Sequence, residues 1–201
     1  MEVYLIRHGE TSGNVAHRHQ AENSPLTTRG VEQARIIATK VKDLEPTHLL
    51  TSPLVRAVET AREIGQVCDL IPETNQNFME LVRPQSMYGN YHTSIKSLTF
   101  YSQWFYGRVN EGESYESLRE RIQLAKGHFA SYPEDARVAV VSHSVFINLF
   151  LAHLCNDKPI GPATALKSFV DIIAMKNTDF VPLIFDPEAH PDTCGWWRVD
   201  H

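Results

Sequence analysis

Val3-Tyr4-Leu5-Ile6-Arg7-His8-Gly9-Glu10-Thr11 is the stretch that decides the fold prediction. Its first four residues form a short apolar run bounded by a glycine, which is typical of a buried strand. Arg7 and His8 therefore lie at the carboxyl end of that strand, the end at which open α/β sheets bind their ligands. We expect a ligand site beside this pair.

A second stretch repeats this plan far downstream. The apolar run Val138-Ala139-Val140-Val141 leads into Ser142-His143-Ser144 and then into an apolar helical pattern. A neutral imidazole held at one nitrogen can act as a covalent nucleophile, and a transferring phosphoryl group is stabilised mainly by positive charge and hydrogen-bond donors. Two strand-end histidines with a strand-end arginine therefore indicate phosphoryl transfer to and from an imidazole.

Composition sets wide limits on the fold and the partners. The 201 residues are 42% hydrophobic and 21% charged, with a formal net charge of −5. This is typical of one globular domain, and we expect a single domain over residues 1–201. The negative charge argues against nucleic acid or an anionic membrane as a bulk partner. No apolar stretch approaches the roughly 20 residues that a membrane span needs. The oligomeric state is not indicated.

The three cysteines, Cys68, Cys155 and Cys194, are odd in number, widely spaced and without a CxxC pair. They indicate neither a disulfide framework nor a cysteine zinc site. Met1 and Glu2 lead straight into the first strand, so no signal or transit peptide is visible, and we expect a cytoplasmic location.

Strand and helix patterns alternate along the chain, which favours a layered α/β fold. Capping hydroxyls at Thr27 and Thr28 precede a helical pattern over residues 31–41, and a short strand follows at His48–Thr51. Ser52 is expected to cap the next helix, with Pro53 at its first position. Leu70-Ile71 is a weak candidate for a third strand.

The second half of the chain continues the alternation. Ser114 is expected to begin a helix whose apolar residues recur at intervals of three and four. Residues 145–154 are apolar nearly all round, which predicts a buried helix. Residues 168–175 and 180–185, joined by Lys176-Asn177-Thr178-Asp179, are interpreted as an antiparallel hairpin.

Val82 to Gly112 does not follow this scheme. The segment is rich in aromatic residues, has no sustained period and is locally basic through Arg83, Lys96 and Arg108. Long insertions of this kind are usually lids or binding loops, and we interpret residues 82–112 as an aromatic-rich lid. A cluster that only packs over the sheet is the alternative.

Arg56 can join the strand-end residues as a second guanidinium. It lies in the first turn of the helix that follows the strand His48–Thr51, where backbone amides also favour anions. His143 would complete the ring of donors from another strand end. For either histidine alone, a buried residue with only a packing role is the alternative interpretation. Two such histidines together with a flanking arginine make that alternative much less favourable.

The segment from Arg7 to Thr11, with Asn14, resembles the signature of the histidine phosphatase superfamily, the phosphoglycerate mutase-like group. Four further segments resemble that family in the same order along the chain: Leu26-Thr27-x-x-Gly30-x-x-Gln33-Ala34, Ser52-Pro53-Leu54-x-Arg56-Ala57-x-x-Thr60-Ala61, Gly112-Glu113-Ser114 and Val141-Ser142-His143. Together they cover residues 2 to about 150.

The resemblance implies a role for each matching residue. His8 would be the phosphorylated nucleophile, with Arg7, Arg56 and His143 forming the phosphate pocket and Asn14 adding a hydrogen bond. Glu80 would be the acid/base carboxyl. We therefore predict a three-layer α/β/α sandwich with a mostly parallel central sheet.

Two carboxyl groups compete for the proton-transfer role. Glu80 lies in Phe78-Met79-Glu80-Leu81, whose apolar residues could raise its pKa to suit both proton donation and proton removal. Without the family match, a solvated surface glutamate is the simpler interpretation. Glu113 could contact substrate, although a favourable charge at the start of the next helix is the preferred interpretation.

The chain also departs from the family. Ser144 follows the second histidine where the family usually has glycine, so its backbone N–H could still meet phosphate while its Cβ narrows the pocket. The basic lid doublets of bisphosphoglycerate-dependent mutases are not recognisable, and the chain is shorter than such mutases. Both points favour water as the phosphoryl acceptor.

His17 and His19 form an HxH pair without a nearby third ligand, so no metal site is predicted. We expect no cofactor. The sequence predicts a metal-independent phosphomonoesterase acting on a small-molecule phosphorylated substrate through phosphohistidine on His8. A phosphoglycerate mutase-type phosphomutase and a non-catalytic phosphate- or phosphoprotein-binding module are the alternatives.

Overall fold

The computed structural model describes residues 1–201 except 110, 157, 187, 190–193 and 200–201. Its centre is a six-stranded sheet with the order β3-β2-β4-β1-β5-β6. Strands β3, β2, β4 and β1 are mutually parallel, whereas β5 is antiparallel to β1, and β6 is antiparallel to β5. The strands are β1 (Glu2–Arg7), β2 (His48–Thr51), β3 (Glu73–Thr74), β4 (Arg137–Ser142), β5 (Phe180–Phe185) and β6 (Trp196–Arg198).

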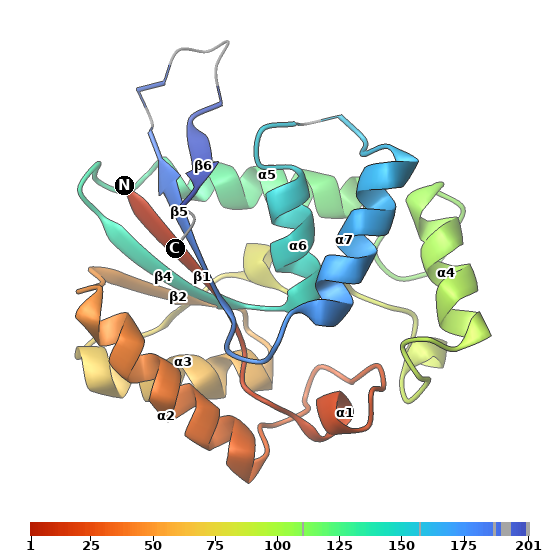
Figure 1. Ribbon diagram of the computed structural model, residues 1–201, viewed down its shortest axis with the longest axis horizontal. Coiled ribbons are helices and arrows are strands. Elements are labelled where there is room, and N and C mark those ends of the chain that lie inside the picture. Colours follow the sequence, from red (N-terminus) through yellow and green to blue (C-terminus); the bar gives the residue numbers. More distant parts are fainter. Residues whose placement is uncertain (110, 157, 187, 190–193, 200–201) are drawn as a thin grey trace.

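Helices cover both faces of this sheet, as Figure 1 shows. Side chains alternate along β1: Val3 and Leu5 join the core cluster that contains α5 and α6 residues, and Ile6 joins the cluster that contains α2 and α3 residues. The predicted three-layer α/β/α sandwich with a mostly parallel sheet is therefore confirmed. The helices of four residues or more are α1 (Ser12–Val15), α2 (Thr28–Asp43), α3 (Val55–Cys68), α4 (Ile95–Phe105), α5 (Tyr115–Phe129), α6 (Ser144–Ala152) and α7 (Pro162–Ala174).

Where periodicity was clear, the sequence placed the elements well. The helix expected over residues 31–41 is α2, whose cap Thr27 accepts a hydrogen bond from the backbone of Gly30 at 3.0 Å. The strand His48–Thr51 is β2, Ser114 caps α5, and the buried apolar helix is α6.

Three expectations about local structure were wrong. Leu70-Ile71 is not a strand: Ile71 is 93% exposed, and the third strand is Glu73–Thr74. Ser52 does not cap α3, which begins at Val55 after Leu54. Residues 168–174 belong to helix α7 rather than to a hairpin, and β5 pairs with β1 and β6 instead. Pro162 at the start of α7 and Gly161 before it are the local reason for that helix.

The lid contains regular structure that the sequence did not predict. A short 3-10 turn covers Gln85–Met87, and α4 follows with Ser94 as its cap. Phe100 and Trp104 of α4 are buried in the main core cluster. The aromatic residues of the lid therefore both pack on the core and, as described below, line a pocket.

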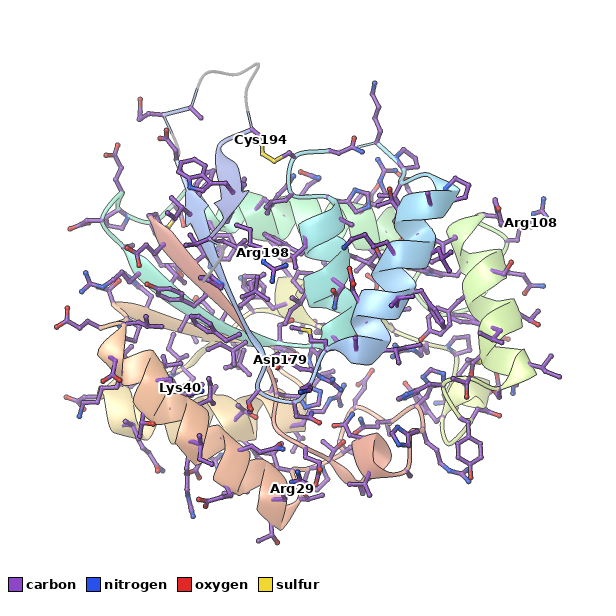
Figure 2. All side chains as sticks on the ribbon, viewed as in Figure 1. Arg29, Lys40, Arg108, Asp179, Cys194 and Arg198 are labelled. Atoms are coloured by element: carbon purple, nitrogen blue, oxygen red, sulfur yellow. A yellow bond between two sulfur atoms is a disulfide. The ribbon has the colours of Figure 1, made fainter. Side chains whose placement is uncertain are left out.

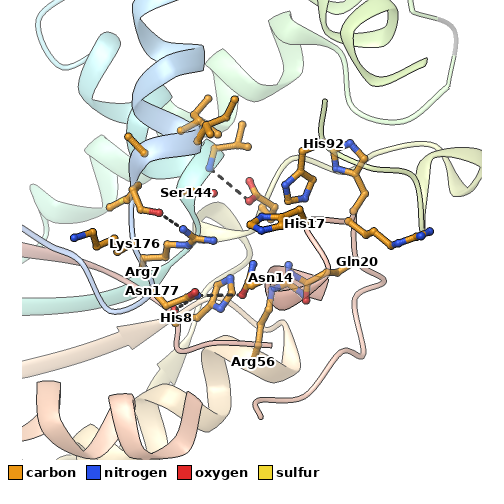
Figure 3. Close-up of a pocket in the computed structure, with 18 of the residues that line it drawn as sticks. Arg7, His8, Asn14, His17, Gln20, Arg56, His92, Ser144, Lys176 and Asn177 are labelled. Carbon is orange, nitrogen blue, oxygen red and sulfur yellow. Dashed lines mark hydrogen bonds between the residues drawn. The ribbon is translucent and has the colours of Figure 1, made fainter. Parts of the chain in front are cut away.

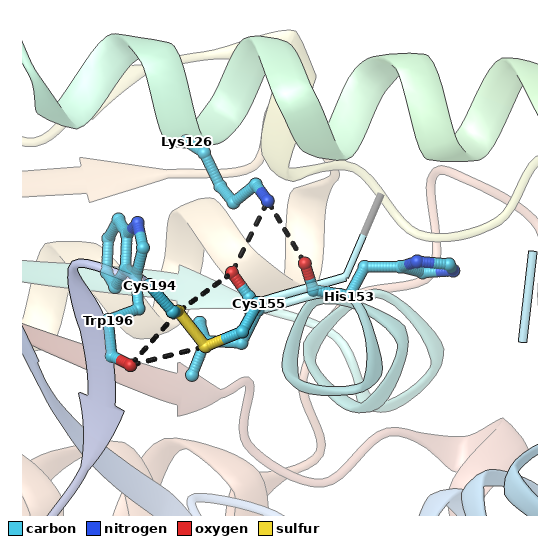
Figure 4. The surroundings of a disulfide bond; sticks show 6 residues. Lys126, His153, Cys155, Cys194 and Trp196 are labelled. Atoms are coloured by element: carbon cyan, nitrogen blue, oxygen red, sulfur yellow. Dashed lines mark hydrogen bonds between the residues drawn. A yellow bond between two sulfur atoms is a disulfide. The ribbon is translucent and has the colours of Figure 1, made fainter. Parts of the chain in front are cut away.

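Cys155 and Cys194 form a disulfide, which corrects the expectation of unpaired cysteines (Figure 4). It links the loop after α6 to the segment before β6, 39 residues further on. In the chain-entropy model, closing a loop of this length stabilises the oxidised fold by about 4 kcal/mol. Cys194 lies far from Asp179, the residue that precedes β5 at the end of the sheet where the site lies (Figure 2). Cys68 is the unpaired cysteine.

None of the helices in the described part of the chain is both long and apolar enough to cross a membrane.

Candidate active site

The parallel strands bring the sequence-predicted residues together at their carboxyl ends. Arg7 ends β1, His8 follows it, and His143 follows the neighbouring strand β4. The ring centroids of His8 and His143 are 5.1 Å apart. Both histidines and Arg56, in the first turn of α3, are at most 4% exposed. Beside them lies a cavity of about 460 Å³, shown in Figure 3.

One hydrogen bond fixes the tautomer of His8. Its Nδ1 lies 2.7 Å from the carbonyl oxygen of Gly9, and a carbonyl can only accept. Nδ1 therefore carries the proton, which leaves the lone pair on Nε2. Burial lowers the pKa of His8 well below its usual value, and the charges of Arg56 and Arg7 lower it further. His8 thus carries a neutral imidazole with a lone pair on Nε2 at pH 7.

The loop after His8 is held by close packing and by Thr60. A Cβ on Gly9 would lie 2.5 Å from the carbonyl oxygen of Gly30, so only glycine fits there without a shift. The Thr60 hydroxyl donates to the carbonyl of Arg56 at 2.7 Å and accepts from the N–H of Gly9 at 3.0 Å. This residue therefore ties the helix that carries Arg56 to the loop that carries His8.

The two arginines are anchored by backbone carbonyls rather than by carboxylates. Nη1 of Arg7 donates to the carbonyl of Met175, and Nη1 of Arg56 donates to that of Ala21 at 3.2 Å. Burial lowers the pKa of Arg56 to about 10, so the guanidinium remains charged at pH 7. Nε of each arginine is buried without a hydrogen-bond partner among the residues that the structure describes. This donor set suits an anion with several oxygens.

His143 is oriented by Ser52. Nε2 of His143 lies 2.8 Å from the Ser52 hydroxyl, and the oxygen of that hydroxyl also accepts from the N–H of Leu54 at 3.3 Å. If Ser52 donates to Nε2, the proton of the neutral ring lies on Nδ1. Nδ1 is buried and has no partner within the described ranges. Burial, with the charge of Arg56 as the next cause, lowers the pKa of His143 well below its usual value.

Glu80 lies in the same pocket as His8. One carboxylate oxygen accepts from the N–H of Leu81 at 2.9 Å, and the other lies 3.5 Å from the N–H of Val145, in the first turn of α6. The carboxyl group therefore stands beside the N-terminus of the helix that follows His143.

Glu113 holds the backbone around Glu80. It forms two hydrogen bonds of 2.7 Å with Arg121 of α5, and both side chains are mostly buried. Arg121 also donates to the carbonyl of Met79 at 2.7 Å, and Glu113 accepts from the N–H of Val82 at 3.3 Å. The pair thus contacts the chain on both sides of Glu80. Arg121 and the N–H of Val82 are therefore the partners that the structure shows for the Glu113 carboxylate.

Asn14 and Ser144, two further residues that the sequence analysis proposes for phosphate binding, also line the cavity. Asn14 belongs to the capping box of α1, and its side-chain oxygen accepts from Thr11 and from Asn177, both at 3.1 Å. Asn177 donates to the carbonyl of His8 at 3.1 Å as well. The sequence pattern placed Asn177 only in a turn, because its approach to His8 depends on the pairing of β5 with β1.

The sequence also missed most of the side chains on the lid side of the pocket. Arg83 donates through Nε to the Tyr101 hydroxyl at 2.9 Å and lines the cavity, whereas Lys96 reaches the carbonyl of Ser86 on the surface. The aromatic and basic composition of residues 82–112 was the available signal. Other missed residues that line the pocket are His17, Gln20, His92, Tyr101, Phe105, Phe169, Ile172 and Lys176.

His19 joins the loop after α1 to the lid. Its Nε2 lies 3.0 Å from the Ser97 hydroxyl, and burial lowers its pKa to about 3. In the part of the chain that the structure describes, no group of three or more His, Cys, Asp or Glu side chains is placed to hold a metal ion.

Comparison with known proteins gives a family for this geometry. Residues 3–168 match the model of the histidine phosphatase superfamily (branch 1). A protein from Proteus mirabilis (strain HI4320), named a probable phosphoglycerate mutase, is 35% identical over 158 residues, which cover 76% of this chain and 74% of that protein.

Solved structures share the fold at lower identity. A mycobacterial glucosyl-3-phosphoglycerate phosphatase aligns with a TM-score of 0.76 and 23% identity, covering 98% of this chain and 96% of that one. A phosphoserine phosphatase mutant from Entamoeba histolytica, in complex with phosphoserine, aligns with a TM-score of 0.78 and 21% identity, covering 99% and 95%.

Proposed function

The chain belongs to the histidine phosphatase superfamily, and from this membership we propose that it is a metal-independent phosphomonoesterase working through phosphohistidine on His8. The observation that carries the proposal is the hydrogen bond from Nδ1 of His8 to Gly9, which leaves Nε2 as an unprotonated nucleophile beside two guanidinium groups.

In the first step, Nε2 of His8 attacks the phosphorus atom and the bond from phosphorus to the leaving oxygen breaks. The phosphoryl oxygens carry the developing negative charge and accept hydrogen bonds from Arg7, Arg56 and His143. Asn14 and the N–H of Ser144 add further hydrogen bonds to these oxygens. Glu80 gives its proton to the leaving oxygen. The products are a neutral alcohol, phosphohistidine and the Glu80 carboxylate.

In the second step, water attacks the phosphorus of phosphohistidine. Glu80 takes the proton from this water, and the bond to Nε2 breaks, which releases inorganic phosphate and restores neutral His8. One carboxyl therefore serves as acid and then as base. Its place among the residues that line the His8 pocket supports both roles.

A phosphomutase is the second candidate, and the name of the Proteus mirabilis relative favours it. Such an enzyme would return the phosphoryl group to another substrate oxygen instead of to water. A non-catalytic phosphate- or phosphoprotein-binding module is the third candidate. The presence of His8, Arg7, Arg56, His143 and Glu80 in one site weighs against it.

A pair of assays separates the three candidates. We expect the protein to release phosphate from p-nitrophenyl phosphate with chelator present, which a binding module would not do. We also expect it to hydrolyse rather than isomerise 3-phosphoglycerate in the presence of trace 2,3-bisphosphoglycerate. If 2-phosphoglycerate forms faster than phosphate is released, the protein is a mutase and the proposed phosphatase function is wrong.

The contact between Glu113 and Arg121 gives a prediction about Glu80. Glu113→Gln leaves a mostly buried guanidinium without its carboxylate and frees the backbone on both sides of Glu80. Since proton donation matters most for poor leaving groups, hydrolysis of an alkyl phosphate should fall about 10- to 100-fold more than that of p-nitrophenyl phosphate. Initial rates on both substrates measure this ratio.

The matched control is Glu116→Gln, which removes a largely exposed partner of Arg119 from the same helix and should leave the ratio unchanged. In a Glu80→Gln background, Glu113→Gln should cause no further change in the ratio. Equal losses on the two substrates in the single variant would show that Glu113 acts on overall folding rather than on Glu80.

We retain the cytoplasm as the proposed location. Thiol buffers keep most cysteine pairs reduced in that compartment, so the exposed Cys155 and Cys194 would be thiols there instead of the disulfide in the structure.

A further inference from the structure

The pocket has a second, apolar side that the proposed chemistry does not use. Tyr101 and Phe105 of α4 line it together with Phe169, Ile172 and Ile173 of α7. The rings of Tyr101 and Phe169 are 6.0 Å apart, so α4 and α7 meet over the cavity. In Figure 1 these two helices stand beside each other above the α1 loop.

This apolar side continues from the pocket onto the surface. Leu166, Val170 and Ile173 are spaced by four and three residues, so they share one face of α7. They are 67%, 56% and 53% exposed, and Ile173 also lines the cavity. Ser168 is the buried residue of this thirteen-residue helix. Most of the apolar surface of α7 is therefore not used by the core of the fold.

The position of Glu80 places the leaving group on this side. The leaving oxygen must come within hydrogen-bond distance of the carboxyl that protonates it. That carboxyl lies beside Val145, which lines the same cavity together with Ile172. The first carbons of the leaving group therefore lie next to Val145, and a longer chain would extend along α7.

Two arginines that line the lid side of the pocket already donate to other groups of the protein. Arg83 donates to the Tyr101 hydroxyl and to the carbonyl of Leu81, and Arg18 donates to the carbonyl of Gly89 and to the Tyr91 hydroxyl. Sugar hydroxyls placed against Phe169 would lose water without gaining partners.

We infer that the substrates are phosphomonoesters of long apolar alcohols, with a linear aliphatic or isoprenoid chain that lies along α7. This inference rests on the phosphatase function proposed above. Each methylene that leaves water for the apolar side contributes binding energy, which raises kcat/KM.

The test uses straight-chain alkyl phosphates from ethyl to decyl, below their micellar concentrations, with 3-phosphoglycerate and phosphoserine as anionic comparisons. We expect kcat/KM to rise by up to about fourfold for each added methylene, until the alkyl chain is longer than the apolar face of α7. We also expect octyl phosphate to exceed both anionic substrates. A flat series, or preference for an anionic substrate, would overturn the inference.

Variants locate the effect. Ile173→Ser should lower the ratio of the octyl to the ethyl rate at least about fourfold, since it makes the mouth of the apolar side polar. Ile36→Ser is the matched control, because Ile36 is 55% exposed on α2 in the other helix layer, and should keep the wild-type ratio. An unchanged ratio in Ile173→Ser would remove α7 from substrate binding.

If p-nitrophenyl phosphate is hydrolysed while the alkyl series is flat, only this inference fails. Hydrolysis of no substrate would overturn the phosphatase function as well.

Discussion

His8→Ala is expected to reduce phosphomonoester turnover by about four orders of magnitude or more, because it removes the atom that accepts the phosphoryl group. Steady-state release of phosphate from p-nitrophenyl phosphate measures the loss. His48→Ala is the matched control: His48 begins β2, at the amino end of the parallel strands, and should retain full activity. A loss of less than tenfold in His8→Ala, in a protein with an unchanged melting temperature, would exclude His8 as the nucleophile.

The pH profile gives an independent test of the same residue. Burial and the two arginines lower the pKa of His8 well below 6.5, so protonation removes the nucleophile only at pH values below 6.5. We expect kcat/KM, corrected for the second ionisation of the substrate, to stay level as the pH falls from 7.5 to 6.5. A fall centred near pH 6.5 would indicate an exposed, ordinary histidine.

Glu80→Gln is expected to have the second largest effect, and its size should depend on the leaving group. Glutamine keeps the shape of the side chain but cannot deliver a proton. The first alcohol release from an alkyl phosphate should therefore slow by about 100- to 10,000-fold, whereas release of p-nitrophenolate should slow far less.

The burst of alcohol release is the quantity to measure for Glu80→Gln. Attack of water on phosphohistidine also needs a base, so steady-state rates would mix the two roles of Glu80. Equal burst losses on both substrates would remove Glu80 from the acid role. Glu113 would not replace it directly, because its carboxylate is engaged by Arg121.

Several parts of this protein could be predicted from the sequence because the signal is local. The apolar runs that became β1 and β4 are buried in the sheet, and the residues that follow them lie at one edge by the geometry of parallel strands. His8 and His143 could therefore be expected to meet. The family resemblance then supplied Glu80, whose local pattern alone also fits a surface residue.

Helix α7 could not be predicted in the same way. Its sequence contains Phe169, Val170, Ile172 and Ile173, a run rich in residues that favour strands. The helical pattern becomes clear only over the longer stretch Pro162–Ala174, in which Leu166, Val170 and Ile173 share one face. The apolar side of the pocket depends on α7, so that side could not be predicted from the sequence either.

Contacts between residues far apart in the chain could not be predicted from the sequence either. The Cys155–Cys194 disulfide joins two segments that meet only after β6 has paired with β5. Asn177 approaches His8 because β5 pairs with β1. Arg121 reaches the backbone on one side of Glu80 from α5, and no spacing in the chain indicates that contact.

The central claim is that His8 carries the phosphoryl group during turnover. Rapid quenching of the wild-type protein with ³²P-labelled phosphomonoester tests it most directly. We expect label that is stable in base and labile in acid, located on the peptide that contains His8. Label that survives acid on serine, or label on cysteine, would contradict the mechanism, as would turnover with no trapped label.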